Sequence, residues 1–135
     1  MKKQLKWSKT LIRIAAIFGI IGAGLGAHMA GAGSLQFRPI HAHILVAGFL
    51  TLLAWGIYYR MVKIRAPRLV SAHVYTAIIG SIGLTVGMWL EFMEPFPLPD
   101  FVNLLTYIIG GSILLVSFIL FFATTFFMVD KKHES

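Results

Sequence analysis

His41-Ala42-His43-Ile44-Leu45-Val46-Ala47-Gly48-Phe49 opens a long apolar run in which two histidines stand one residue apart. On an α-helix, side chains two residues apart point about 200° away from each other. One metal ion beside the helix therefore cannot easily bind both imidazoles, whereas two metals on opposite sides can each bind one. The alternative is that both rings lie among lipid headgroups and bind water. An ionisable residue in a membrane span is by default a candidate for function.

The composition places the chain in the membrane class. Hydrophobic residues make up 58% of the sequence, charged residues make up 13%, and the mean hydropathy is +0.82. A length of 135 residues holds about four spans of ~20 residues and leaves no room for a soluble catalytic domain. The absence of cysteine excludes disulfides, thiolate metal sites, iron–sulfur clusters and c-type haem attachment. The basic residues behind the net charge of +7 lie mostly at span ends, which indicates membrane topology and not a nucleic-acid partner.

Four apolar runs predict an all-α fold, a four-helix transmembrane bundle that forms a single membrane domain over residues 1–135. The predicted spans cover about residues 10–29, 39–59, 69–92 and 101–129. Pro39 is expected in the first turn of the second span, where its missing N–H costs nothing. The first run follows a basic tail and could be a secretory signal peptide. Its length and its Gly22-xxx-Gly26 pattern favour a retained helix that packs closely on a neighbour.

Two further groups of residues are assigned to packing. Gly83 and Gly87 in the third span are expected at a contact between helices. Phenylalanines near the end of the fourth span are expected to face lipid or a second subunit; they are Phe121, Phe122, Phe126 and Phe127.

Lysine and arginine are unevenly divided among the segments that join the spans. The N-terminal tail, the segment from Arg60 to Arg68 and the C-terminal tail hold most of them, whereas the other two loops hold only Arg38. The positive-inside rule then predicts that both termini are cytoplasmic, in a multi-pass protein of the cell membrane.

This orientation separates the histidines into two layers. His28, His41 and His43 would lie together at the outer end of the spans. His73 would lie near the inner end, on the order of 20 Å from that layer, which is too far to share a metal with it in one chain. We therefore expect His73 to be an interfacial residue or a hydrogen-bond partner.

Three chemistries stay open for the outer histidines. Zinc prefers four tetrahedral ligands, and His28 and His41 with a further group could form such a site. Copper accepts the same imidazoles, with Met29 as a possible soft ligand. Haem b needs one or two axial histidines, an apolar slot and a cationic partner for its propionates, which Arg38 could provide.

At this point the residues resemble a known family. The stretch His41-Ala42-His43-Ile44-Leu45-Val46-Ala47-Gly48-Phe49, followed by Tyr58-Tyr59-Arg60 and Ser71-Ala72-His73-Val74-Tyr75, resembles short four-span bacterial proteins related to cytochrome c oxidase subunit I, of the haem–copper oxidase superfamily. The resemblance covers a little under a third of the chain, from about Pro39 to Gly80.

The resemblance implies a division of labour between the two histidines. In the large oxidases a similar His-x-His pair serves two haems, the first histidine binding the high-spin haem and the second the low-spin haem. The matching positions here are His41 and His43. The position four residues after His73, where short relatives often have a further histidine, is Ala77.

We therefore expect a membrane protein that binds haem b through His41 and His43, with Arg38 and His28 beside the cofactor. Its expected role is electron transfer or the binding of a diatomic gas such as O2 or NO. The alternative is a non-haem copper or zinc protein, or a structural or assembly protein. Whether the chain is an enzyme, and which redox partner it meets, stays open.

Small residues on several spans also predict a homo-oligomer. Dimers are the commonest closed assembly of identical chains. The resemblance suggests a trimer as a second possible assembly, because three copies of a four-span chain would resemble one twelve-span oxidase subunit.

The orientation can be tested with a reporter enzyme that is active only outside the cytoplasm. Fused after Ser135, it should give no signal, because the basic residues hold both termini inside. Strong activity of that fusion would overturn the orientation and place His41 on the cytoplasmic side.

Overall fold

The chain folds into four long helices, as the apolar runs predict. The computed structural model describes residues 1–129, and the C-terminal tail with Lys131, Lys132 and His133 lies outside the described residues. The elements in chain order are α1 (Lys2–Ala32), α2 (Arg38–His43), the π-helix η1 (Ile44–Thr51), α3 (Leu52–Met61), α4 (Pro67–Met93) and α5 (Asp100–Thr125). Because α2, η1 and α3 continue one another, the described residues contain four helices long and apolar enough to cross a membrane.

Proline and backbone geometry set the ends of these helices. Pro39 and Pro67 both stand in the first turn of a helix, where no intrahelical N–H is needed. Gly33 ends α1 in the left-handed conformation, with φ 63°, and donates its N–H to the Met29 carbonyl. Glu94 ends α4 with φ 43°, a left-handed conformation that a non-glycine residue rarely adopts.

The fourth helix is shorter than predicted. The predicted span runs to about residue 129, but α5 ends at Thr125. After it the chain turns back, so that the Arg65 N–H donates to the Phe127 carbonyl at 2.9 Å and the Val129 N–H donates to the Lys63 carbonyl at 3.0 Å. The apolar run therefore extends beyond the end of α5, because the backbone of its last residues bonds to the loop between α3 and α4.

The second span contains a feature that hydropathy does not predict. Directly after His43 the helix widens into the π-helix η1 for 8 residues. The Thr51 hydroxyl donates to the Val46 carbonyl, five residues back, at 2.8 Å. Wide turns of this kind are rare and occur often at functional sites.

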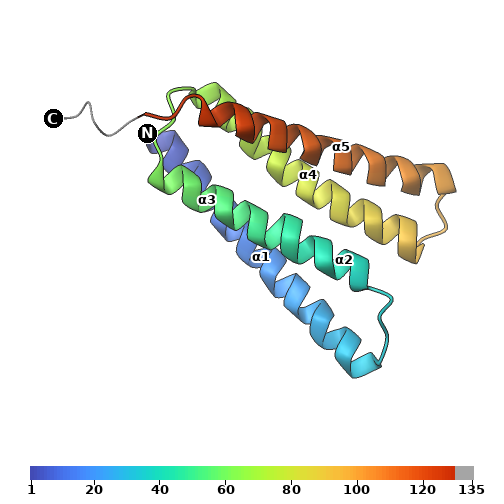
Figure 1. The fold of residues 1–135 in the computed structure, drawn as a ribbon. Coiled ribbons are helices and arrows are strands. Elements are labelled where there is room, and N and C mark those ends of the chain that lie inside the picture. Colours follow the sequence, from blue (N-terminus) through green and yellow to red (C-terminus); the bar gives the residue numbers. More distant parts are fainter. Residues whose placement is uncertain (130–135) are drawn as a thin grey trace.

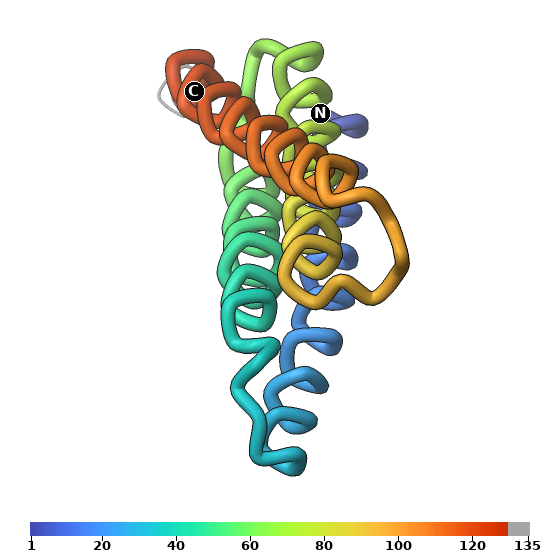
Figure 2. Tube along the Cα trace, turned by 90° about the vertical axis from the view of Figure 1, so that its right-hand side faces the viewer, coloured from blue at the N-terminus to red at the C-terminus, as the bar shows by residue number. Residues whose placement is uncertain are grey.

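The four helices form two antiparallel hairpins that are close at one end and apart at the other (Figure 1). One hairpin pairs α1 with the span from α2 to α3, and the other pairs α4 with α5. The start of α1 and the end of α5 lie at the end where the hairpins meet. The view turned by 90° shows α5 crossing the molecule obliquely, with α4 between it and α1 (Figure 2).

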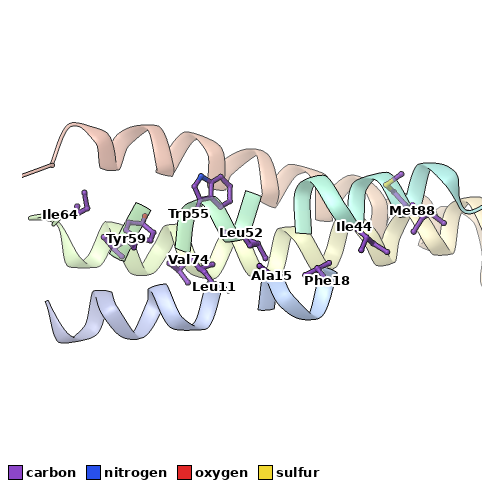
Figure 3. Close-up of a cluster of buried hydrophobic side chains, with 13 residues drawn as sticks. Leu11, Ala15, Phe18, Ile44, Leu52, Trp55, Tyr59, Ile64, Val74 and Met88 are labelled. Carbon is purple, nitrogen blue, oxygen red and sulfur yellow. The ribbon is translucent and has the colours of Figure 1, made fainter. Parts of the chain in front are cut away.

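The core lies between α1, the second span and α4. Its largest fully buried side chains include Leu11 of α1, Leu52 and Tyr59 of α3 and Met88 of α4. Figure 3 shows these side chains spread along the space between the helices, with Leu11 and Leu52 near the middle and Tyr59 and Met88 toward opposite ends. Helix α5 contributes no member of this buried cluster, and it reaches the cluster only through partly buried side chains such as Tyr107 and Phe121.

Glycine brings α4 and α5 into backbone contact. A Cβ built on Gly87 would lie 2.4 Å from the Cα of Tyr107, and one on Gly110 would lie 2.2 Å from the carbonyl carbon of Gly83. Real Cβ atoms essentially never come so close, so only glycine permits this approach. The expected packing role of Gly83 and Gly87 is confirmed.

Two adjacent glycines test this contact. Gly110→Ala should lower the free energy of unfolding by about 1–3 kcal/mol, because the methyl group meets the α4 backbone. Gly111→Ala is the matched control, since its Cβ would meet only a Leu84 methyl group at 3.6 Å. It should stabilise the chain by up to about 1 kcal/mol through helix propensity. Thermal unfolding in detergent, followed by circular dichroism, measures both, and equal stability of the two variants would contradict the close contact.

Candidate functional site

His41 lies against the face of α1 that carries Gly22 and Gly26, which we call the glycine face. Its ring is half-buried, and Nδ1 is 2.8 Å from the Gly22 carbonyl oxygen. A Cβ built on Gly26 would be 3.0 Å from Cε1 of the same ring, so glycine leaves room for the imidazole. Because a carbonyl oxygen only accepts hydrogen bonds, the neutral ring must carry its proton on Nδ1. Its Nε2 then has a free lone pair and no partner among residues 1–129.

His43 repeats this arrangement on another side of the helix. Its ring is exposed, and Nδ1 is 2.8 Å from the Pro39 carbonyl oxygen of its own helix. The same reasoning places the proton on Nδ1 and the lone pair on Nε2. The His41 ring faces α1, whereas the His43 ring is exposed and bonds to its own helix. The two histidines therefore do not converge on one point, in agreement with the geometry of side chains two residues apart.

The other two predicted site residues lie at the same hairpin end. Arg38 is exposed at the start of α2. His28 is exposed near the end of α1, and its ring meets Phe37 edge-on at a centroid distance of 6.1 Å. Among the described residues no group of three or more histidine, aspartate or glutamate side chains gathers where it could hold a metal ion. The structure thus places these residues near one another without assembling a closed side-chain metal site.

An apolar groove opens beside α2, the short helix that contains His41 and His43. It contains a cavity of about 270 Å³ between α1, the start of the second span and α4, with Phe18, Ile40, Ile44 and Trp89 in its lining. A second cavity of about 340 Å³ continues it along α1 and α4 and shares Phe18 with it. Ile40 and Ile44 are one turn apart, so this face of the helix lies between the directions of the two histidines. Neither histidine lines either cavity.

A second polar cluster lies at the end where the hairpins meet. His73 is fully buried, and its Nδ1 is 2.6 Å from the Tyr59 hydroxyl. The Trp55 indole meets the imidazole edge-on at a centroid distance of 4.5 Å. Within the described residues, His73 Nε2 is buried without a hydrogen-bond partner, and so is the Tyr58 hydroxyl oxygen. Of the two roles expected for His73, the structure shows that of a hydrogen-bond partner.

One phenylalanine of this cluster, Phe121, lies elsewhere than predicted. Phe121 packs on Tyr58 at a centroid distance of 5.0 Å and on Trp55 at 5.5 Å, so it faces the protein and not lipid. Phe122 and Phe126 are exposed, with 63% and 70% of their surface accessible, as predicted.

Polar side chains of α1 attach it to this end of the molecule. The Ser8 hydroxyl donates to the Gly56 carbonyl at 2.7 Å, and the Trp7 indole N–H donates to the Ser71 hydroxyl at 3.1 Å. The Gln4 amide donates to the Tyr59 carbonyl at 2.8 Å. Sequence reasoning missed these contacts. A signal for the His73 cluster was present, because a tight hairpin centred near residue 64 places residues 55 and 73 opposite each other.

Comparison with protein families, with curated proteins and with solved structures finds no match to this chain.

Two adjacent tyrosines test the buried cluster. Tyr59→Phe removes the hydrogen-bond partner that His73 Nδ1 has among residues 1–129, so the free energy of unfolding should fall by about 1–3 kcal/mol. Tyr58→Phe removes a buried hydroxyl that has no partner in the described part of the chain, so it should be neutral or stabilising. Thermal unfolding in detergent measures both effects. A larger loss from Tyr58→Phe than from Tyr59→Phe would contradict the hydrogen bond to His73.

Proposed function

We propose that the chain binds haem b through His41 and His43 and serves in electron transfer or in the binding of a diatomic gas. One observation carries the proposal: each imidazole donates its Nδ1 proton to a backbone carbonyl at 2.8 Å and keeps a free lone pair on Nε2. Metal-bound histidines almost always donate their other ring N–H in this way, which fixes the tautomer and the ring orientation.

The surroundings of the two rings fit a haem. The edge of the His41 ring that carries Nδ1 and Cε1 faces α1 where Gly26 leaves space, and the adjacent groove is lined by apolar side chains. Arg38 lies three residues before His41 and is exposed, so its guanidinium is available to pair with propionates. When bound, a haem would supply one-electron iron chemistry and a site for a diatomic gas ligand.

The size of the cavity points to a site shared between chains. A volume of about 270 Å³ is below the ~300–1,000 Å³ of pockets that enclose a drug-sized ligand. His43 is exposed with its Nε2 free, and α5 shows a large exposed apolar surface that includes Phe101 and Leu115. We propose a homo-oligomer, a trimer or a dimer, in which a neighbouring chain completes the surroundings of the haem.

The charges support the proposed orientation. The end where the hairpins meet carries Lys2, Lys3, Lys6 and Lys9 together with the basic loop from Arg60 to Arg68. By the positive-inside rule this end is cytoplasmic, and His41 and His43 then lie toward the outer face of the cell membrane. The His-x-His pair of the short relatives of cytochrome c oxidase subunit I supports the same assignment of the two histidines.

The ligands are tested by replacing each histidine. His41→Ala and His43→Ala should each lower the haem content per chain or change the spectrum of the bound haem. We expect the affinity for haem to fall about tenfold or more, because replacing even a group that only hydrogen-bonds to a metal ligand costs 10–100-fold in affinity. His133→Ala should have no effect. The measurement is haem content per mole of purified chain, with the absorption spectrum of each variant. Full haem retention with an unchanged spectrum in both span variants would exclude this site.

A matched glycine pair provides a control without changing a ligand. Gly26→Ala places a methyl group 3.0 Å from the His41 ring and should alter its coordination, whereas Gly24→Ala meets nothing within 4 Å. Equal spectra of the two variants would show that the His41 ring does not hold the haem from its place on α1.

A further inference from the structure

The loop between α4 and α5 lines a polar cavity that is open to solvent and separate from the histidine site. The cavity has a volume of about 350 Å³ and lies at the tip of the second hairpin. Its lining residues are Glu94, Pro95, Phe96, Pro97, Leu98, Asp100 and Asn103. Glu94 and Asp100 are exposed, so both carboxylates can be reached from solvent.

Asn103 forms the buried part of this lining. Only 3% of its surface is accessible, and its Oδ1 is buried with no hydrogen-bond partner among residues 1–129. Leaving a buried polar oxygen unpaired costs free energy, so such groups are rare in native proteins. Because Asn103 also lines the cavity, a rotation of its amide group would present this oxygen to a hydrogen-bond donor or a cation there.

The negative charge of this hairpin tip has no compensation nearby. No lysine or arginine occurs in the sequence between Arg68 and Lys131. Within residues 1–129 neither the Glu94 nor the Asp100 carboxylate has an ion-pair or hydrogen-bond partner. The carbonyl end of α4 adds partial negative charge, and the first-turn acid Asp100 offsets the positive end of α5.

The loop backbone is also rich in acceptors. Pro95, Pro97 and Pro99 have carbonyl oxygens but no N–H groups. The cavity therefore offers oxygen atoms in excess over donors, and its lining includes no histidine, cysteine or basic side chain.

We propose that Glu94, Asp100 and Asn103 bind a divalent cation of the calcium type. Calcium takes 6–8 oxygen ligands in a flexible arrangement of carboxylates, amide carbonyls and water, whereas softer metals prefer nitrogen or sulfur. The volume of the cavity leaves room for several coordinated waters. With two carboxylates the site belongs in the weak range of roughly 10⁻⁴–10⁻³ M that suits extracellular modules.

Trp89 provides a built-in reporter for the site. Its indole meets Phe96 of the loop edge-on at a centroid distance of 5.6 Å. Terbium(III), an oxygen-seeking ion, can therefore be excited through Trp89 when it occupies the cavity, and calcium chloride should displace it.

The test titrates the full chain in detergent with terbium chloride and then with calcium chloride. Saturable terbium emission that calcium reverses is expected. Glu94→Gln and Asp100→Asn should each weaken binding about tenfold or more, since charge count sets affinity. Asn103→Asp should tighten it, an effect that misfolding cannot produce. Glu91→Gln, a carboxylate of α4 outside the lining, should leave affinity within about twofold.

Three results would overturn the proposal. The first is the absence of saturable emission from the unaltered chain. The second is emission that persists at equal affinity in both Glu94→Gln and Asp100→Asn. The third is an equal loss in Glu91→Gln, which would indicate diffuse attraction of cations to the acidic surface. Helix content by circular dichroism establishes that each variant is folded.

Discussion

The contact between the glycine face of α1 and the start of the second span decides where His41 lies. A Cβ on Gly22 would lie 2.4 Å from a Leu45 methyl carbon, and a Cβ on Gly26 would touch the imidazole. Only because both positions lack side chains can the ring approach the α1 backbone and bond to the Gly22 carbonyl. That one hydrogen bond fixes the orientation of the ring and its tautomer. The proposed ligand role of His41 therefore depends on helix packing as much as on the histidine.

A second constraint acts at the opposite end of the molecule. In a lipid environment, polar groups must find their partners within the protein. Ser8 and Gln4 meet this requirement by bonding to the α3 backbone within their own hairpin, and Trp7 bonds to Ser71 of α4. The bond from Trp7 to Ser71 joins the two hairpins where they meet, and the other ends diverge around the apolar groove. The histidine site and the acidic cavity thus occupy the separate tips of two hairpins.

Much of the fold could be predicted from the sequence because hydropathy and small residues report directly on membrane helices. The apolar runs predicted the four helices, Pro39 marked the start of one, and the spacing of Gly83 and Gly87 indicated a close contact. Which face of each helix turns inward could not be predicted, because a helix that is apolar all round has little amphipathic signal. For this reason the inward position of Phe121 was missed.

The directions of the two histidines at the candidate site could be predicted, but their surroundings could not. The spacing of His41 and His43 predicted two different directions, and the structure shows them. The Gly22 carbonyl partner of His41 depends on the packing of α1 on the second span, and the π-helix after His43 has no signal in the composition, so neither could be predicted. The burial of the Asn103 amide could not be predicted either, because an asparagine near the start of a helix is common in sequences.

The absorption spectrum of the purified, unaltered chain, oxidised and then reduced with dithionite, tests the haem proposal most directly. The account predicts a red protein with a Soret band that shifts on reduction, and carbon monoxide would show whether an axial position is open. A colourless protein that also fails to take up added haem would contradict the assignment of His41 and His43 as haem ligands.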